Sequence, residues 1–322
     1  MAVADLYIVA GSKVSTGAPV VMTSPDAATW TEVPSWPGGN ADYVHIANDT
    51  YIVSTAPALT PNNYAHSDDG ASWNLNDTPP AVLSAVWAGD RYVFLGATNA
   101  YTSPTLDSSW NGPYPKGSTN EPRRLLFHDG VLVGVGRGGG AGQPPVWYST
   151  DLGATWSTYM PTNNVGVWDV TRGPDRFIAV RPRFGGASDA VLSSTAGTSW
   201  SLLSTGLTDH AWYNVCYGNG RYVAVGIDNP GNIKVMTSTD GVSWTGHTPT
   251  GLATLTAGVL SGSSRMAFGL GRFLLVNPLI GSVFVSTDGT AWTEQTFADR
   301  DFRGCAAGRA IPRGGPYLGL RR

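Results

Sequence analysis

The sequence contains little charge and few of the residue types on which many catalytic sites depend. Only 13% of its 322 residues are charged, and the formal net charge of −3 excludes a generally basic nucleic-acid-binding surface. Lysine and glutamate each occur only three times, at Lys13, Lys116, Lys234, Glu32, Glu121 and Glu294. This shortage of glutamate limits any mechanism that needs a glutamate acid, base or nucleophile.

Cysteine and histidine are also scarce. Two cysteines, Cys216 and Cys305, cannot form a disulfide framework, and we expect both to be buried thiols. The five histidines show no metal-ligand spacing, so the sequence predicts no metal site. The glycine pattern at 134–139 follows an apolar run, but Pro144 and Pro145 come soon after it, so no helix can begin there to receive a pyrophosphate. We therefore expect no cofactor.

Long hydrophobic runs are absent as well. The first five residues carry no basic residue, and Asp5 interrupts their apolar stretch, which is typical of a strand. We expect no signal peptide and no insertion into a membrane.

A short motif recurs along the chain, and its clearest copy is Ser238-Thr239-Asp240-Gly241-Val242-Ser243-Trp244. Seven copies of varying quality end at tryptophans 30, 73, 110, 156, 200, 244 and 292, at intervals of 37 to 48 residues. The copy ending at Trp200 lacks the aspartate, and the copy ending at Trp30 lacks the glycine. A period of this length without a helical apolar pattern predicts a β-propeller with one blade per repeat.

The residue types of the motif suit a tight turn between two strands. An aspartate can accept hydrogen bonds from backbone N–H groups two residues further on, and glycine supplies a positive φ. The tryptophan begins the next strand and covers the turn with an apolar face. We therefore interpret these residues as structural: Asp26, Asp69, Asp151, Asp240, Asp288, Trp30, Trp73, Trp156, Trp244 and Trp292.

The sequence thus predicts an all-β fold, a single seven-bladed propeller of four-stranded antiparallel blades over residues 1–310, followed by a tail over 311–322. The first repeat begins at its second strand, near Tyr7, and lacks an inner strand. Residues 302–308 supply a candidate, so we expect the C-terminal inner strand to close the ring and remove its exposed edges. Cys216 and Cys305 are expected to share one register in two blades.

The motif resembles the Asp-box, also called the bacterial neuraminidase repeat, and the resemblance covers nearly the whole chain. The resemblance implies that the boxes are structural and lie away from any active face. We use "turn face" for the side of the ring that holds these turns, and "loop face" for the opposite side, which holds the longer and more variable loops. Variable loops on a rigid scaffold commonly carry function.

Polar residues recur where the inner strands begin, eight residues before the first aromatic or apolar residue of the second strand. The position is occupied by Tyr43, Ser84, Arg124, Asp169, Asn214 and Arg265, with Arg303 at the matching place in the C-terminal strand. One hypothesis is that Arg124, Arg265 and Arg303 bind a small anionic or polar ligand at the mouth of the channel. The alternative is that these groups are solvated and pair with Asp169 around a water-filled channel.

A second arginine set follows the first hairpin of four repeats, on the turn face: Arg91, Arg176, Arg221 and Arg272. It is either an anion-docking surface for a partner, as in an assembly factor, or a set of arginines that pair with nearby turn aspartates and carbonyls.

Resemblance to sialidases implies an arginine triad, a tyrosine nucleophile paired with a glutamate, and a catalytic aspartate. Only Glu121 could approach the channel, and a pair of carboxylates would have to combine Asp169 with Asp42 or Asp209. We therefore predict no catalytic residue. The resemblance to bacteriophage Asp-box propellers instead implies a virion component of a tail or fibre that contacts a host glycan or other virion proteins. The alternative function is a sialidase-like glycosidase. The alternative to a location in the virion is the cytoplasm.

Overall fold

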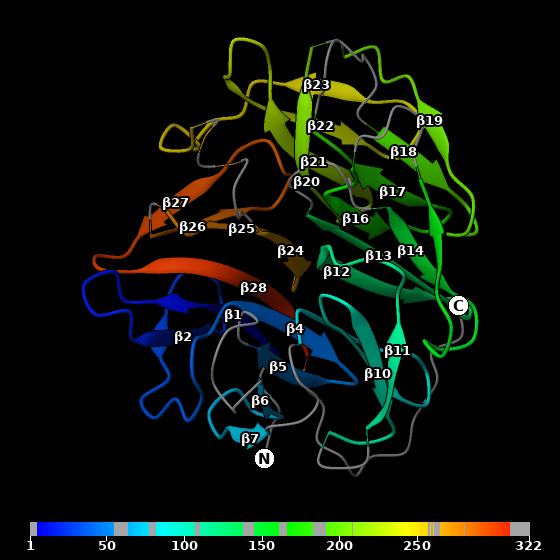
Figure 1. Ribbon diagram of the computed structural model, residues 1–322. Coiled ribbons are helices and arrows are strands. Elements are labelled where there is room, and N and C mark those ends of the chain that lie inside the picture. The colour runs from blue at the N-terminus through cyan, green and yellow to red at the C-terminus, as the bar shows by residue number, and fades with distance from the viewer. Residues whose placement is uncertain are drawn as a thin grey trace.

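The computed structural model describes residues 5–54, 64–76, 82–106, 110–137, 145–160, 166–182, 191–207, 209–256, 258, 260, 265–279 and 281–309. These residues form seven four-stranded antiparallel sheets arranged as the blades of a ring (Figure 1). The predicted all-β, seven-bladed propeller is therefore confirmed. The predicted tail over 311–322 lies outside the described residues, as do parts of the loops between second and third strands.

We number the blades in chain order and give the strands of each from the inside of the ring outward. Blade 1 contains β28 (Asp301–Arg309), β1 (Asp5–Ser12), β2 (Pro19–Ser24) and β3 (Thr31–Glu32). Blade 2 contains β4 (Tyr43–Ala47), β5 (Thr50–Ser54), β6 (Tyr64–Ser67) and β7 (Asn74–Asn76). Blade 3 contains β8 (Ser84–Trp87), β9 (Tyr92–Leu95), β10 (Asn99–Ser103) and β11 (Asn111–Pro115).

The remaining four blades follow the same order. Blade 4 contains β12 (Glu121–His128), β13 (Val131–Arg137), β14 (Val146–Ser149) and β15 (Ser157–Tyr159). Blade 5 contains β16 (Asp169–Arg172), β17 (Phe177–Val180), β18 (Val191–Ser194) and β19 (Ser201–Leu203). Blade 6 contains β20 (Ala211–Gly218), β21 (Arg221–Ile227), β22 (Ile233–Ser238) and β23 (Thr245–His247). Blade 7 contains β24 (Arg265–Gly269), β25 (Arg272–Asn277), β26 (Ser282–Ser286) and β27 (Thr293–Thr296).

The second strand of each blade is strongly apolar and deeply buried. Strands β5, β9 and β17 are buried along their whole length, because neighbouring blades cover both of their faces. The core accordingly consists of seven apolar clusters, each of which joins residues of two adjacent blades. Within the described residues, no helix is long and apolar enough to cross a membrane.

The ring closes through the pairing of the C-terminal strand with the N-terminal one. β28 runs antiparallel to β1 from the pair Arg309 and Asp5 to the pair Asp301 and Ser12. A β-bulge interrupts this pairing between Ala10 and Gly11. The predicted closure by a C-terminal inner strand is therefore confirmed.

The recurring turns are held by their aspartates. In the clearest copy, the Asp240 carboxylate accepts hydrogen bonds from the backbone N–H groups of Val242 and Ser243, both at 2.8 Å. The N–H of Gly241, at φ +71°, donates to the Ser238 hydroxyl at 2.8 Å. The carboxylates of Asp26, Asp69, Asp151 and Asp288 each accept backbone N–H hydrogen bonds in the same way.

The tryptophans cover these turns from the side. The indole N–H of Trp73, Trp156, Trp200 and Trp292 donates to the carbonyl of the turn glycine three residues earlier. Trp30, whose copy lacks the glycine, donates to the Gln295 side chain at 2.7 Å instead. Each outer strand begins one residue after the tryptophan rather than at it, because the tryptophan still belongs to the turn.

Tyrosines at the start of the second strand join neighbouring blades. The hydroxyl of Tyr222 in blade 6 donates to the Arg176 carbonyl in the hairpin of blade 5, at 3.0 Å. Tyr7 and Tyr51 make the corresponding contacts, with the Leu270 and Gly308 carbonyls of the preceding blades. Blades 4, 5 and 7 have Leu132, Phe177 and Phe273 at this position, so they lack the hydroxyl.

Candidate functional site: the central channel

A cavity of about 330 Å³ lies in the central channel, between the inner strands of the blades. Of the predicted residues, Tyr43, Ser84, Arg124 and Arg265 line it, whereas Asp169, Asn214 and Arg303 do not. Arg123 lines it as well, so three arginines contribute to its wall. Among the described residues that line it, none is an aspartate or a glutamate.

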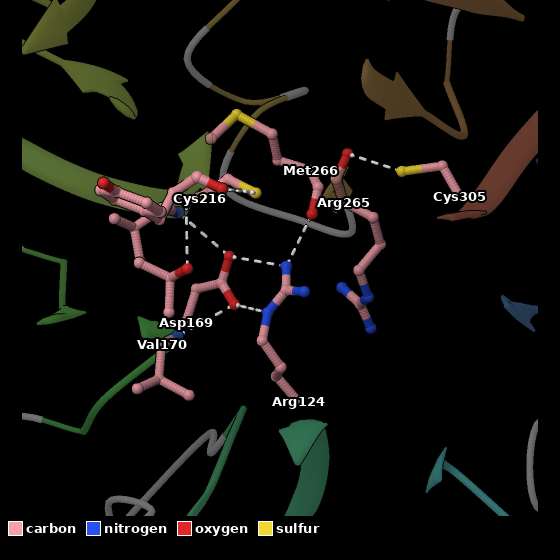
Figure 2. A network of polar contacts seen from close by, with 10 residues as sticks. Arg124, Asp169, Val170, Cys216, Arg265, Met266 and Cys305 are labelled. Carbon is pink, nitrogen blue, oxygen red and sulfur yellow. Dashed lines mark hydrogen bonds and ion pairs between the residues drawn. The ribbon is translucent and has the colours of Figure 1, made fainter. Parts of the chain in front are cut away.

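Arg124 crosses the channel, and its guanidinium group forms hydrogen bonds through Nε and one Nη. Its Nε donates to one oxygen of Asp169 at 2.6 Å, and one Nη donates to the other oxygen at 3.2 Å. The same Nη donates to the Met266 carbonyl at 2.7 Å (Figure 2). Arg124 belongs to blade 4 and Met266 to blade 7, on the far side of the ring. Burial opposes the charge of Arg124, but the adjacent Asp169 carboxylate raises its pKa overall.

Asp169 connects three inner strands. Its carboxylate also accepts hydrogen bonds from the backbone N–H of Val170 in its own blade and of Val215 in blade 6, both at 3.0 Å. Only 3% of the Asp169 surface is exposed, so its charge is satisfied from inside the protein. The alternative to ligand binding was that the arginines pair with Asp169 around the channel. The structure shows this pairing for Arg124.

Arg303 is not at the ring position at which the sequence comparison placed it. Gly304 pairs with Ala10 and occupies the position equivalent to Arg265, whereas Arg303 lies in the β-bulge next to it. The side chain of Arg303 is 40% exposed and forms ion pairs with Asp42 at 2.8 Å and Asp301 at 2.7 Å. The alignment was wrong by one residue, because no hairpin joins β28 to β1 and the eight-residue spacing that places the other residues cannot be counted for this strand.

The same one-residue shift separates the two cysteines. Cys216 pairs with Val223, one residue after Tyr222, whereas Cys305 pairs with Val9, two residues after Tyr7. The expectation that they share a register was therefore wrong. Both are free, buried thiols that line the cavity, and burial raises the pKa of each to about 12. They are protonated at neutral pH and are poor nucleophiles.

Arg265 projects toward the channel from β24, into the same space as Arg124 (Figure 2). Its guanidinium lies over the Tyr43 ring, with 5.5 Å between the guanidinium carbon and the ring centroid. Burial lowers the pKa of Arg265, and the nearby charge of Arg124 acts in the same direction. Burial also disfavours the charged form of Tyr43. It raises the pKa of the hydroxyl, which therefore remains protonated at neutral pH. Asn214, the remaining predicted residue, is fully buried.

Two cavity residues were missed by the reasoning from the sequence. Arg123 precedes Arg124 in a bulge of β12, and its guanidinium lies 5.4 Å from the Trp168 ring centroid. His45 has a buried Nε2 that makes no hydrogen bond within the described part of the chain. Burial, followed by the charges of Arg265 and Arg124, lowers the pKa of His45 to about 3, so the ring is neutral. The sequence held no signal for His45, because a single histidine on an inner strand does not recur in the other repeats and has no ligand-like spacing to other residues.

The inward-facing aspartates are held in ion pairs. Asp42 is buried and pairs with Arg303, and Asp169 is buried and pairs with Arg124. Glu121, at the start of β12, is exposed. Neither Asp42, Asp169 nor Glu121 is among the residues that line the cavity. A glycosidase needs one carboxylic acid and one carboxylate facing its substrate, and these three residues do not provide that arrangement.

The turn face carries more aspartates than arginines. Arg91 pairs with the neighbouring Asp90 at 2.8 Å, and the Arg176 Nη donates to the Ser193 hydroxyl at 3.4 Å. The described aspartates of the turns and hairpins on this face are Asp26, Asp49, Asp68, Asp69, Asp90, Asp129, Asp151, Asp175, Asp240 and Asp288. The second arginine set, Arg91, Arg176, Arg221 and Arg272, is therefore embedded in an acidic surface.

No protein-family model matches the chain, and no curated protein sequence matches it. Solved structures with a similar fold include a GH74 xyloglucanase from Xanthomonas campestris, with a TM-score of 0.61 and 13% identity over 96% of this chain and 53% of the enzyme. Apo AztD from Citrobacter koseri has a TM-score of 0.56 and 11% identity over 97% of this chain and 100% of its own. YCF48 bound to a D1 peptide has a TM-score of 0.53 and 16% identity over 79% and 82% of the two chains. Likeness at these identities establishes the β-propeller fold that the chain shares with these proteins.

Proposed function

We propose that the protein is a non-catalytic binding propeller whose central channel holds a small anionic ligand. The observation that supports this is the wall of the cavity, to which Arg123, Arg124 and Arg265 contribute while no described lining residue is acidic. The Asp169 carboxylate, which pairs with Arg124, is not among the residues that line the cavity. An anion in the cavity would receive charge-assisted hydrogen bonds, which are stronger than neutral ones.

The assignment as a non-catalytic protein is supported by the state of the candidate acids and nucleophiles. The two inward aspartates are engaged by arginines, the Tyr43 hydroxyl is protonated, and both cysteine thiols are protonated. A sialidase-like glycosidase is the alternative, and it would require Glu121 to activate the Tyr43 hydroxyl as a nucleophile. We propose no metal and no cofactor.

For the biological setting we propose a component of a bacteriophage virion, in the tail or a fibre, that contacts host glycan or other virion proteins. This part rests on the resemblance of the repeat to phage propellers, and it involves neither nucleic acid nor membrane insertion. Docking of a partner through the arginines of the turn face is the weaker candidate, because aspartates outnumber them there. Antibodies against the purified protein should label the tails of virions whose genome encodes it; labelling confined to the host cytoplasm would contradict this setting.

Calorimetric titration of the purified protein with small carboxylates tests the channel. We expect saturable binding that Arg265→Met weakens about tenfold or more and that Arg221→Met, a matched change on the turn face, leaves intact. The same preparations should not hydrolyse a fluorogenic sialoside or glucoside. Turnover that is lost in the Arg265→Met protein would overturn the non-catalytic assignment. If the protein binds no carboxylate, the proposed site is wrong.

A further inference from the structure

The residues that line the cavity form successive levels along the channel, which the strand register defines. Tyr43, Ser84, Arg124 and Arg265 pair with second-strand residues Ser54, Leu95, Val135 and Val276 and form the first level, toward the loop face. Ile46, Tyr217 and Phe268 pair with Tyr51, Tyr222 and Phe273 and form the fourth level, toward the turn face. Three residues of β-strand separate these levels, which corresponds to about 10 Å.

The two ends of the cavity differ in chemistry. All of its arginines lie at the first level or in the bulge beside it, and the Tyr43 and Ser84 side chains share that end. The lining residues of the deeper levels are mostly apolar: Val44, Ile46, Ala85, Val86, Leu125, Leu126, Met266, Ala267, Phe268, Ala306 and Ala307. The cavity is therefore cationic toward the loop face and apolar toward the turn face.

Apart from the Tyr217 hydroxyl at the fourth level, the polar groups at the deeper levels offer few hydrogen bonds to a ligand. The Thr171 hydroxyl accepts a hydrogen bond from the Tyr217 backbone N–H. The thiols of Cys216 and Cys305 lie near the Tyr217 and Arg265 carbonyls, at 4.0 and 3.5 Å. The Nε2 of His45 is the one buried polar side-chain atom of the described cavity wall that lacks a partner. A ligand with many hydroxyl groups would bury several of them without partners, and each of these would weaken its binding about fivefold or more.

We infer that the ligand of the channel is an amphipathic carboxylate, with its anionic head between Arg124 and Arg265 and an apolar body that extends toward Ile46 and Phe268. This inference rests on the proposed function and narrows it to one ligand class. The head receives charge-assisted hydrogen bonds, while the body removes apolar surface from water over a distance of about 10 Å. Aryl-alkyl acids and medium-chain fatty acids have these dimensions, whereas sugar acids do not have the apolar body.

Four probes that differ in one property at a time test the inference by calorimetric titration of the full chain. 3-Phenylpropionate carries both features, 3-phenylpropionamide lacks the charge, propionate lacks the apolar body, and gluconate replaces that body with hydroxyl groups. We expect 3-phenylpropionate to bind at least about tenfold more tightly than each of the others, because a charged hydrogen bond and a buried phenyl ring each raise affinity about tenfold or more.

Two variants test which end of the cavity binds the anionic head and which end binds the apolar body. Arg265→Met should weaken 3-phenylpropionate about tenfold or more, because it removes the charge that faces the head. Ile46→Thr shortens the side chain by one carbon and places a hydroxyl at the apolar end, so it should weaken 3-phenylpropionate about fivefold and leave propionate unchanged. Thermal unfolding of each variant shows that it is folded before its affinity is interpreted.

The outcomes separate this inference from the proposed function. Equal affinity for 3-phenylpropionate, propionate and gluconate would overturn the amphipathic ligand and leave an anion-binding channel. Equal affinity for the acid and its amide would overturn anion binding and with it both proposals. If none of the four probes binds, the channel is not a ligand site and both proposals fail.

Discussion

The carboxylate of Asp169 lies 2.6 Å from the Nε of Arg124 and joins the inner strands of blades 4, 5 and 6 at a single point. Through its contact with the Met266 carbonyl, Arg124 extends this connection to blade 7 on the far side of the channel. Contacts between adjacent blades, such as the hydrogen bond from Tyr222 to the Arg176 carbonyl, do not cross the channel, so this pair is a brace across the centre of the ring.

Asp169→Asn should strongly destabilise the protein. The substitution leaves the Arg124 guanidinium buried without its counter-charge, a change that typically costs about 3–5 kcal/mol. Urea unfolding followed by tryptophan fluorescence measures the loss. Asp42→Asn is the matched control, and it should cost less because the side chain of its partner Arg303 is 40% exposed and also pairs with Asp301. Equal losses in the two variants would show that the Arg124–Asp169 pair contributes no more to the free energy of unfolding than the Arg303–Asp42 pair.

Lys116 should make the stability of the fold depend on pH. Its ammonium is buried, donates to the Ser118 and Asn120 carbonyls at 2.7 and 2.8 Å, and lies 4.3 Å from the Trp147 ring centroid. Burial lowers its pKa from 10.5 to about 7, so between these values the unfolded chain binds more protons than the folded one. The free energy of unfolding should therefore rise as the pH is raised from 7 toward 10.

Urea midpoints at pH 6.5 and 9 measure this dependence, with Lys116→Met as the reference. The difference between the wild type and this variant should shift in favour of the wild type at the higher pH, because methionine does not titrate. A difference that stays constant across this range would mean that Lys116 titrates with an ordinary pKa in the folded protein.

Ala196→Asp should stabilise the turn of blade 5. This turn keeps the Gly197 N–H donating to the Ser194 hydroxyl, at 2.7 Å, but lacks the carboxylate present in its relatives. An aspartate here can accept the N–H groups of Thr198 and Ser199, a capping interaction worth about 0.5–1 kcal/mol. The melting temperature measures the gain, and Asp240→Ala in blade 6 should lose a similar amount. No gain in the first variant together with a loss in the second would indicate that the two turns are not equivalent.

The hydroxyl of Tyr222 should contribute to the contact between blades 5 and 6. Tyr222→Phe removes its hydrogen bond to the Arg176 carbonyl and should cost about 1 kcal/mol. Gly173→Ala should cost more, because a Cβ at this position overlaps the same hydroxyl. The double variant tests the explanation by urea unfolding: Tyr222→Phe should relieve part of the damage caused by Gly173→Ala. Simple addition of the two losses would contradict it.

The blade repeat was predictable because its signals are local. Turns such as 238–244 require an aspartate, a glycine and a tryptophan at fixed spacing, and the apolar second strands stand at a constant distance from them. The missing inner strand of the first repeat and the surplus strand at the end of the last repeat were also visible in the sequence. Together these features determined the number of blades and the way in which the ring closes.

The content of the channel was decided by the tertiary structure alone. Arg124, Arg265 and Arg303 come from similar places in their repeats, but one is held by Asp169, one lies over Tyr43, and one lies in a bulge paired with Asp42. A bulge changes which residue faces the channel without changing the spacing of the repeat, and an ion pair across the ring joins residues of different blades. The sequence by itself therefore determined the scaffold, because each turn and strand is specified by neighbours in the chain. Only the folded ring determined the site, because its residues meet only when distant blades surround one channel.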